Sequence, residues 1–375
     1  MLRVGFLKRD QNWNRNILCH QYESLSLVRV VSLSRLVHAF LRRARIKASF
    51  LENVYFGPSA PRVHILHVWR MVCMTRIPWV VTTSVGLPFG WPRKWWPRAF
   101  KILAGPQCCK ILVNSYHAKK LQEQKLDHMP EWADEILPKV EILPTPQPLL
   151  VGDVQQKSLP NDSVVLTFVG HLFFQKGGPA LIAALEHLNN CGFNIRVNVV
   201  SQLKPDEFSG VDSLEIARWK TRLSSLPFVT WYPSLPNPQV LDLFRKSHAG
   251  VLLSFAEAYG YSVLEAQAAG CATITTDVGA LPELNNEQCG WILPVRHLGF
   301  DLYDASSLRR VWEYLTPRLI ELLSSLAAQP SKLLEKGRQA LDRIRRVHDP
   351  LWHKSRLESI YWEVLDAQKG ERPKV

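Results

Sequence analysis

Short apolar runs alternate with amphipathic stretches throughout the second half of the chain. Buried strands are typically about four to eight apolar or β-branched residues long, whereas helices place apolar residues three and four positions apart. We therefore predict strands over 164–169, 193–201, 228–232, 251–255 and 273–276. The predicted helices between them cover 179–189, 212–225, 238–247 and 261–269. Strict alternation of strand and helix indicates an α/β domain with a doubly wound parallel sheet.

The first half of the chain shows the same alternation less regularly. Its predicted strands cover 2–7, 63–68, 79–83, 110–114 and 139–143, and its predicted helices cover 33–45 and the residues capped by Ser115. The proline-rich stretch 144–148 cannot continue a helix, and a polar stretch follows it. We therefore predict a first domain over 1–150 and a second over 151–347. The second ends in helices over 306–327 and 332–347, and the last segment, 348–375, holds an amphipathic helix over 352–365.

The composition is that of a globular protein with room for two hydrophobic cores. The chain has 375 residues, of which 46% are hydrophobic and 21% are charged. No run of about 18 apolar residues predicts a membrane span, since the best candidate, 25–41, carries Arg29, Arg35 and His38. The N-terminus does not have the pattern of a secretory signal, because the charged residues 8–10 directly follow the first predicted strand.

The seven cysteines lie at positions 19, 73, 108, 109, 191, 271 and 289. They form no pair with the Cys-x-x-Cys spacing of a metal site, and an odd number without a framework indicates reduced thiols. We therefore expect a cytoplasmic protein without a zinc site.

The positive charge of the chain is concentrated in its first 100 residues. These hold 16 Lys and Arg against 3 Asp and Glu, whereas the rest holds 30 of each, so the first 100 account for the whole net charge of +13. They also hold six of the thirteen tryptophans. Such an excess attracts phosphate-rich surfaces, either anionic lipid or nucleic acid.

The most informative chemistry lies where the predicted strand 251–255 passes through a turn at Gly260 into the helix 261–269. A helix N-terminus presents free N–H groups and partial positive charge, so a phosphate is the expected ligand. Glu257 and Glu265 flank this turn. They would repel a phosphate unless they bind another part of the same ligand, and sugar hydroxyls suit carboxylates. The alternative is a solvated helix start with glutamate in its first turns.

This Glu-x7-Glu spacing resembles that of the retaining family 4 glycosyltransferases of GT-B fold (glycosyl transferases group 1). The resemblance extends through Gly270, Thr276, Asp277, Gly279, Pro282 and Glu283. It implies that Glu257 meets the hydroxyls of the donor sugar, that Glu265 meets the ribose, and that Gly260, Tyr261 and Ser262 face the diphosphate. It also implies two Rossmann-like doubly wound domains facing a central cleft, with 348–375 as a closing helix that returns to the first domain.

A second match covers the strand end and loop from Phe168 to Gly178. Gly170 ends the strand, Lys176 matches a lysine that clamps the donor diphosphate in the family, and His171 stands where the family usually has an arginine. An ammonium beside phosphate oxygens stabilises the leaving diphosphate. The alternative for Lys176 is a solvated loop lysine, and a neutral imidazole cannot replace a bidentate guanidinium.

The first domain resembles the family less closely. His67 lies on a strand that in the family ends near the acceptor, although a lone histidine on an apolar strand is more often a core residue. Ser84 or Val85 replaces a histidine that the family often carries near the reacting sugar. The segment 12–16 replaces the usual Gly-rich turn. We take His67 and Ser84 as candidate acceptor-side residues.

Basic and aromatic residues combine in two places in the first domain. Five cations border an apolar stripe of Leu36, Val37, Phe40 and Leu41; they are Arg35, Arg42, Arg43, Arg45 and Lys47. The loop 90–98 interleaves tryptophan with arginine and lysine. Both features predict contact with an anionic bilayer. The alternative for the helix is that its apolar side packs on the core.

Together these features predict a retaining glycosyltransferase that moves a sugar from a nucleotide-diphosphate-sugar donor to an acceptor hydroxyl, in polysaccharide or glycolipid biosynthesis. Glu257 and Lys176 would be its catalytic residues. We expect a sugar or lipid-linked sugar as acceptor, an anionic membrane surface as a further partner, and a place in the cytoplasm at the inner face of the membrane. We expect neither metal nor cofactor, because no Asp-x-Asp cluster stands at a strand end and the nucleotide sugar is the substrate.

Three alternatives remain open. An epimerase or phosphorylase would keep the fold and change the reaction, although no lysine is distinctive as a pyridoxal site. The departures in the first domain are compatible with a catalytically inactive member. A non-enzymatic protein that binds nucleic acid or another anionic surface would use the positive first domain, but the chain carries no helix-turn-helix or RNP motif. We therefore expect no nucleic-acid partner.

Overall fold

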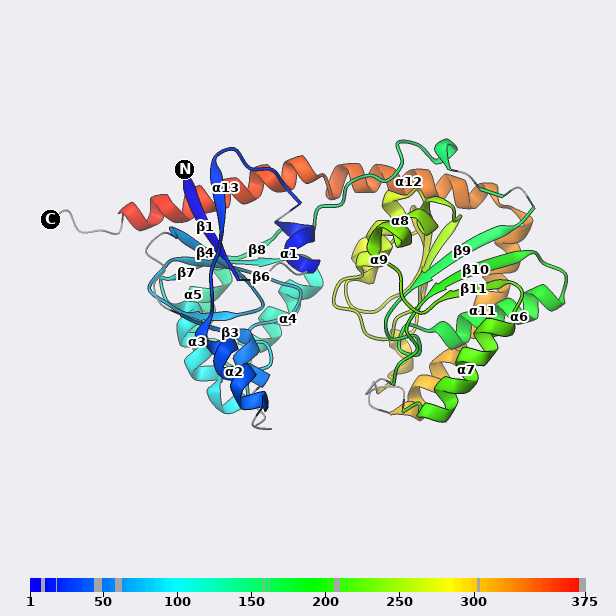
Figure 1. Ribbon diagram of the computed structural model, residues 1–375, viewed down its shortest axis with the longest axis horizontal. Coiled ribbons are helices and arrows are strands. Elements are labelled where there is room, and N and C mark those ends of the chain that lie inside the picture. Colours follow the sequence, from blue (N-terminus) through cyan, green and yellow to red (C-terminus); the bar gives the residue numbers. More distant parts are fainter. Residues whose placement is uncertain are drawn as a thin grey trace. The chain divides into compact units, whose positions relative to one another are not determined.

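The computed structural model describes residues 1–7, 11–17, 19–43, 49–57, 63–157, 159–160, 162–205, 210–301 and 304–370. It divides into two compact units (Figure 1). Unit 1 comprises Met1–Pro146 and Asp349–Val375, and unit 2 comprises Gln147–His348. Residues 8–10, Arg45 and Lys47, on which predictions were made above, lie outside the described residues. Among the helices of the described part, none combines the length and the apolar character needed to cross a bilayer.

Unit 1 is built on a parallel sheet of six strands in the order β2-β1-β4-β6-β7-β8. The strands are β1 (Leu2–Phe6), β2 (Leu25–Arg29), β4 (Ile65–Trp69), β6 (Trp79–Thr83), β7 (Cys108–Val113) and β8 (Val140–Ile142). A separate parallel pair consists of β3 (Val54–Phe56) and β5 (Val72–Met74). The α-helices are α1 (Gln11–Asn16), α2 (Leu33–Arg43), α3 (Trp96–Ala104), α4 (Tyr116–Leu126), α5 (Ala133–Ile136) and α13 (Pro350–Gly370). Ser115 is the N-cap of α4, as predicted, since its side chain accepts from the Ala118 N–H.

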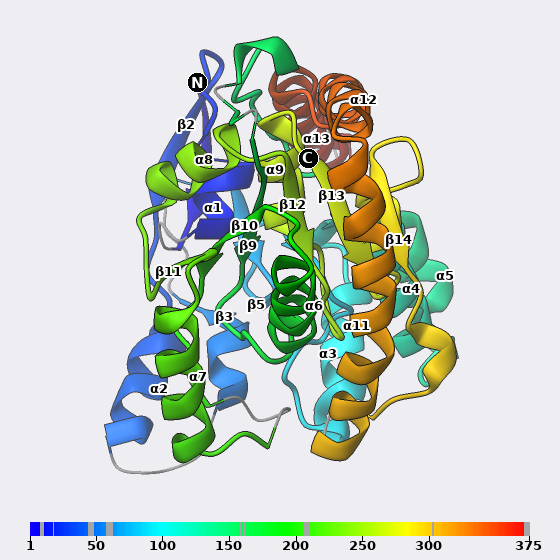
Figure 2. The same ribbon diagram turned by 90° about the vertical axis from the view of Figure 1, so that its right-hand side faces the viewer.

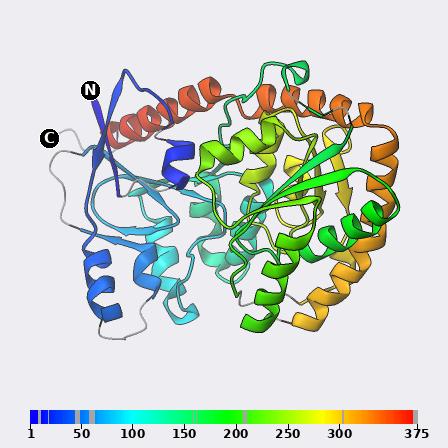
Figure 3. The same cartoon turned by 45° about the vertical axis from the view of Figure 1, so that its right-hand side comes forward.

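Hydrophobic side chains project from both faces of this sheet, because successive residues of a strand point in opposite directions. On one face Val4, Ile65 and Val80 pack against Ile360 and Tyr361 of α13. That helix, red in Figure 3, runs along the sheet of unit 1. On the other face the strand residues Leu66, Val68 and Val81 pack with Phe100 and Leu103 of α3. A parallel sheet buried on both sides is the expected result of such alternation.

Unit 2 repeats the plan with a parallel sheet in the order β11-β10-β9-β12-β13-β14. The strands are β9 (Val164–Val169), β10 (Ile195–Val200), β11 (Val229–Tyr232), β12 (Ala249–Leu252), β13 (Ala272–Thr276) and β14 (Gly290–Leu293). The α-helices are α6 (Gly178–Asn190), α7 (Ser213–Ser225), α8 (Asn237–Arg245), α9 (Tyr261–Ala268), α10 (Leu281–Leu284), α11 (Ala305–Ala328) and α12 (Ser331–Val347). Figure 2 shows α6 and α11 side by side on one face of the sheet. The other face is covered by α8 and α9.

The strand orders of the two sheets confirm the predicted doubly wound architecture. In each sheet the chain adds strands first toward one edge and then toward the other, with the switch between β1 and β4 in unit 1 and between β9 and β12 in unit 2. Every strand predicted in the second half occurs, although β12 lies about two residues earlier than its apolar run. The predicted loop over 90–98 is wrong in part: the 3₁₀ turn η2 (Arg93–Trp95) and the start of α3 occupy 93–98. Proline at the second position of α3 suits a helix start, because its missing N–H is not needed there.

Candidate functional site

The ends of β9 and β12 bring two of the predicted segments together in unit 2. The strands are neighbours, with Val251 paired to Phe168, so the loops that follow them meet at the carboxyl edge of the sheet. The Phe255 N–H donates to the Gln175 carbonyl over 3.0 Å. Gly177 allows this approach: its φ is +74°, and a Cβ there would lie 2.5 Å from Leu253 Cβ. The carboxyl edge at adjacent central strands is where open α/β sheets bind ligands.

Lys176 and Glu257 form an ion pair at this edge. The Lys176 side chain passes over Gly170, where a Cβ would lie 2.9 Å from Lys176 Cγ. Its Nζ contacts Glu257 Oε2 and donates to Ser254 Oγ over 3.3 Å. Both charged side chains are partly buried, with 16% and 15% exposed, so each keeps some accessible surface. A partly buried ammonium can bind phosphate oxygens, while its carboxylate partner can accept from hydroxyls.

The backbone around Glu257 is fixed by Gly279, which follows β13. Gly279 has φ +56°, and a Cβ would lie 1.8 Å from the Glu257 carbonyl oxygen. Asp277 Oδ1 accepts from the N–H groups of Val295 and Arg296 over 2.8 and 3.1 Å. These two residues of the family-like pattern therefore hold the loops at the sheet edge. Asp277 and Gly279 thus contribute to the site through the backbone, without contact with a ligand.

The N-terminus of α9 lies directly after this ion pair in the chain. Gly260 is its N-cap with φ +112° and without a side-chain capping bond. Residues with a Cβ rarely adopt this φ, so the turn favours glycine at this position. Tyr261 and Ser262 are half-buried, and the Tyr261 ring packs edge-on against Tyr259 at 5.2 Å. The first N–H groups of a helix have no helical partner and favour an anion.

Glu265 lies one turn further along α9 and is 5% exposed. Its Oε1 accepts from Asn237 Nδ2, at the start of α8, over 2.8 Å. A buried carboxylate needs hydrogen-bond donors, so Asn237 stabilises the position of Glu265. Asn237 was missed in the sequence, because it lies 28 residues earlier and only the fold brings it here.

His171 stands apart from these groups. It follows Gly170, is exposed, and makes no hydrogen bond or ion pair with any residue that the structure describes. Its predicted place beside the donor diphosphate stays a prediction.

The acceptor-side candidates of unit 1 have structural partners. His67 is fully buried, with Nδ1 2.6 Å from Tyr361 Oη and Nε2 2.7 Å from Thr82 Oγ1. Burial lowers its pKa from 6.5 to about 3, so the ring is neutral near pH 7. This arrangement favours the core alternative for His67. Ser84, 2% exposed, accepts from Arg70 Nη2 over 2.6 Å.

Arg70 was not among the predicted site residues, although its position at the end of β4 was visible in the sequence. It has φ +56°, unusual for a residue with a Cβ. Its guanidinium lies 5.3 Å from the Phe89 ring centre and 5.6 Å from that of Trp69. Ser84 is therefore the hydroxyl partner of a cation at the carboxyl edge of the unit 1 sheet.

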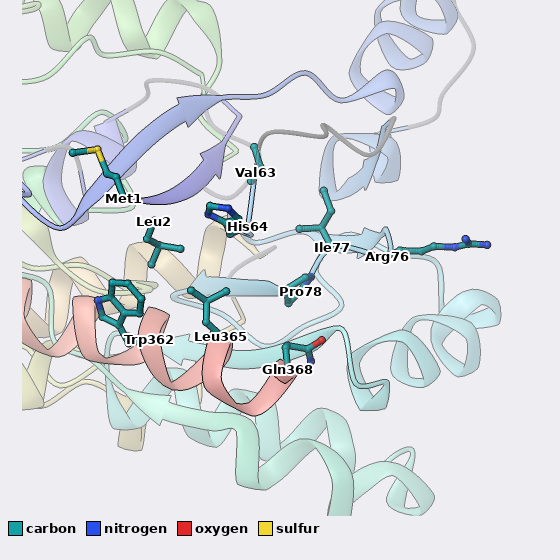
Figure 4. A pocket seen from close by; sticks show the side chains of 10 residues that line it. All are labelled: Met1, Leu2, Val63, His64, Arg76, Ile77, Pro78, Trp362, Leu365 and Gln368. Carbon is teal, nitrogen blue, oxygen red and sulfur yellow. The ribbon is translucent and has the colours of Figure 1, made fainter. Parts of the chain in front are cut away.

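A pocket of about 580 Å³ lies elsewhere in unit 1 (Figure 4). It is lined by Leu2 and His64 at the amino ends of β1 and β4, and by Trp362 and Gln368 of α13. His64 Nδ1 accepts from the Arg3 N–H over 3.0 Å. No predicted site residue lines it, and it lies at the edge opposite to that used by ligands of α/β sheets. Within the described ranges, no group of three or more His, Cys, Asp or Glu is placed to hold a metal ion.

Two Rossmann-like α/β units in one chain define the architecture of the GT-B class, and solved structures of glycosyltransferases share it. The structure of a glycosyltransferase from Rickettsia africae is 13% identical with TM-score 0.62, covering 97% of this chain and 98% of that chain. The Anabaena protein HepE, solved with UDP and glucose, is 12% identical with TM-score 0.58, covering 96% of this chain and 99% of that chain. At these identities the likeness shows a shared fold.

Sequence comparison leads to the same class for part of unit 2. Residues 153–297 match the family "Glycosyl transferases group 1". D-inositol 3-phosphate glycosyltransferases are similar: that of Segniliparus rotundus is 29% identical over 134 residues, covering 36% of this chain and 29% of the relative. That of Streptomyces avermitilis is 30% identical over 126 residues, covering 33% and 27%. The matches thus span less than a third of these relatives' length.

Proposed function

We propose that the protein is a retaining family 4 glycosyltransferase that transfers a sugar from a nucleotide-diphosphate-sugar donor to an acceptor hydroxyl. The observation that carries the proposal is the pairing of Lys176 with Glu257 at the carboxyl edge of unit 2, directly before the N-terminus of α9. Glu265 lies in the same helix. All three residues fall within the segment that matches the glycosyltransferase family.

The donor would contact three neighbouring groups in unit 2. The diphosphate docks on the turn formed by Gly260, Tyr261 and Ser262, where helix N–H groups supply donors and partial positive charge. Lys176 contributes a full positive charge and stabilises the negative charge that builds on the leaving diphosphate. Gly170 lets this lysine cross the strand end. Glu265 accepts from the ribose hydroxyls.

Glu257 acts on the sugar itself. Its carboxylate accepts from donor hydroxyls while the ion pair with Lys176 holds it in place. The acceptor hydroxyl attacks on the face of the leaving group, and the leaving phosphate receives the acceptor's proton, so the anomeric configuration is retained. Lys176 and the helix N-terminus take the role that a divalent ion has in other transferases, so the proposal includes neither metal nor cofactor.

The acceptor and the cellular setting are proposed from the first domain. A sugar or lipid-linked sugar is the acceptor, as in polysaccharide or glycolipid biosynthesis, and an anionic membrane surface is a further partner. The charge of residues 1–100, 16 basic against 3 acidic, supports that partner. All seven cysteines are free, which supports a reducing compartment and hence the cytoplasmic face of the membrane.

Two carboxylate variants test the donor site. Calorimetric titration with UDP, GDP and ADP identifies the nucleotide, and the corresponding nucleotide sugars are then assayed for turnover. We expect Glu265→Ala to weaken binding of the nucleoside diphosphate about tenfold or more, because a charged hydrogen bond to ribose is lost. We expect Glu257→Ala to abolish turnover while the nucleoside diphosphate still binds.

Glu287→Ala is the matched control, because it removes an exposed carboxylate of the same unit. Unchanged binding and turnover in both site variants would contradict the proposal. Loss of nucleotide binding in all three variants would point to unfolding of unit 2, which circular dichroism detects.

A further inference from the structure

An uncovered apolar stripe lies on α2 of unit 1. Leu33, Leu36, Val37 and Phe40 have the spacing of one helix face, and they are 39%, 59%, 48% and 72% exposed. An amphipathic helix of a globular protein normally turns such a stripe toward the core. Here Ser34 is the fully buried residue of the helix instead. The predicted alternative, that the apolar side of this helix packs on the core, is therefore wrong for Leu36, Val37 and Phe40, whereas Leu41 of the predicted stripe is half-buried.

An apolar groove continues this stripe across the β3–β5 pair. It has a volume of about 320 Å³, roughly that of ten water molecules. Its apolar walls include Val37, Phe50, Phe56, Met74, Trp91 and Trp95. Phe50 stacks on Trp95 with ring centres 6.3 Å apart, and its edge meets Trp91 at 6.2 Å. Water in such a groove has few polar partners, so an apolar occupant is favoured.

The polar groups of the groove are already bonded or lie at its rim. The Ser34 hydroxyl donates to the Val54 carbonyl over 2.5 Å. Trp91 Nε1 donates to the Asn53 carbonyl over 3.4 Å. Arg98 also lines the groove and is exposed. The occupant of the interior therefore needs no hydrogen-bonding groups of its own.

Exposed cations lie close in the sequence to residues of the stripe and the groove. They include Arg42 and Arg43 at the end of α2, Arg93 and Lys94 in η2, and Arg98 of α3, which lines the groove. Among the described residues next to the groove wall, Glu52 is acidic, and its Oε1 lies 3.2 Å from His38 Nδ1. An apolar interior with a basic rim matches a lipid whose headgroup is anionic. Tryptophans beside the rim suit the boundary between headgroups and chains.

We propose that this face of unit 1 rests in an anionic lipid leaflet and that the groove takes one acyl chain of an anionic lipid. The proposal rests on the membrane contact proposed above and adds the place and the mode of that contact. A second copy of the chain fits less well, because a two-fold contact would bring the same face onto itself. The cations of one rim would then oppose those of the other.

Vesicle binding by the full chain tests the proposal. The probes are vesicles of phosphatidylcholine alone and vesicles with 30% phosphatidylglycerol. We expect binding to the anionic vesicles, and we expect Phe56→Asp and Val37→Asp each to weaken it at least tenfold, since both place a carboxylate in the groove. Trp352→Asp is the matched control: Trp352 of α13 is 51% exposed, as Phe56 is, and does not line the groove. It should change binding less than twofold.

Quenching of tryptophan fluorescence distinguishes insertion of an acyl chain into the groove from adsorption by charge. Phosphatidylglycerol brominated within its acyl chains quenches only those tryptophans that reach the chains. We expect quenching in the unchanged protein and a smaller fraction quenched in Trp95→Leu, which keeps the groove apolar and removes one reporter.

Binding that 0.5 M salt abolishes, without chain quenching and with equal affinity in Phe56→Asp and Trp352→Asp, would overturn the proposal in favour of adsorption by charge. Self-association that Phe56→Asp abolishes, without vesicle binding, would overturn it in favour of a second copy. Vesicle binding and tryptophan quenching do not require nucleotide binding or glycosyl transfer, so a failure of nucleotide binding does not change these two measurements. The lipid-groove proposal and the donor-site proposal can therefore be refuted independently.

Discussion

The two units carry the same six-stranded parallel scaffold but place different chemistry at its carboxyl edge. In unit 2 the strand ends present Lys176 paired with Glu257, with both side chains partly accessible. In unit 1 the histidine near the corresponding edge is fully buried, and Ser84 is bonded to Arg70. Function therefore follows the side chains at the strand ends rather than the fold that carries them.

The two units also differ in the distribution of their charge. Unit 2 lies entirely within the part of the chain where acidic and basic residues balance, so its charges act in pairs at short range. The excess of positive charge falls in the first 100 residues, and many of its cations, such as Arg42, Arg43 and Lys94, are exposed. This difference agrees with the two proposals, a small charged ligand for unit 2 and an extended anionic surface for unit 1.

Removal of the cation at the edge of unit 2 should have the largest effect. We expect Lys176→Ala to lower kcat by about 10²–10³-fold, since the charge on the leaving diphosphate is no longer compensated. Arg222→Ala is the control, because it removes a cation paired with Glu186 on the surface of the same unit. Steady-state assays with the donor found by calorimetry measure both. A Lys176→Ala enzyme as active as the control would remove the contrast between the two sheet edges.

Five of the six strands of unit 2 could be predicted, because its central strands, such as β12 and β13, are buried on both faces and read as continuous apolar runs. The edge strand β14 was missed. Those missed in unit 1 gave weaker signals. β3 and β5 are three residues long, too short to show a period, and β2 merges with the apolar residues of α2 that follow it. The tryptophans of 90–98 suggested a loop, yet Pro97 in fact opens a helix.

The site was predictable only as far as its motif reached. The spacing of Glu257 and Glu265 and the Lys176 loop lie within short segments, so their types and positions could be recognised. Their partners could not: Asn237 reaches Glu265 from another helix, and Gly279 touches the Glu257 backbone from the next strand. Such contacts between distant segments arise from the tertiary fold and leave no local pattern.

Substitution of Gly279 tests whether the edge of unit 2 depends on this backbone contact. We expect Gly279→Ala to cost about 3 kcal/mol of unfolding free energy and to impair donor binding, because its Cβ would collide with the Glu257 carbonyl. Gly192 offers a matched control with φ +88° and nothing within 4 Å of a Cβ. Gly192→Ala should cost only about 1 kcal/mol, from backbone strain. Urea titration and calorimetry compare them, and equal costs would refute the contact.

A pH series tests the core role of His67 in unit 1. Burial lowers the pKa of His67 to about 3 from 6.5. Below pH 6.5 the unfolded chain gains a proton there that the folded chain does not, so this stability is complete above pH 6.5 and is lost as the pH falls toward 3. We expect His67→Gln to remove roughly 1 kcal/mol per pH unit from the pH dependence of unfolding free energy between pH 6 and 4.

His171→Gln is the control for this series, because His171 is exposed. His20 and His248, whose pKa values burial also lowers to about 4, are present in every variant, so only the difference in slope matters. Urea midpoints at each pH measure it. Equal slopes for His67→Gln and the unchanged protein would show that His67 is not buried as described.

The smallest effect is expected from introducing an arginine at the position where the proposed family usually has one beside the diphosphate. His171 is exposed at the strand end, one residue after Gly170, so a longer side chain has room there. A guanidinium can bind phosphate oxygens through two parallel bonds, whereas a neutral imidazole cannot. We expect His171→Arg to tighten nucleoside diphosphate binding about three- to tenfold, or about 1 kcal/mol, in calorimetric titration. His171→Lys adds the charge without the fork and should gain less. If neither variant gains affinity, the diphosphate does not reach this strand end, and the edge of unit 2 binds its ligand through the α9 turn without the β9 loop.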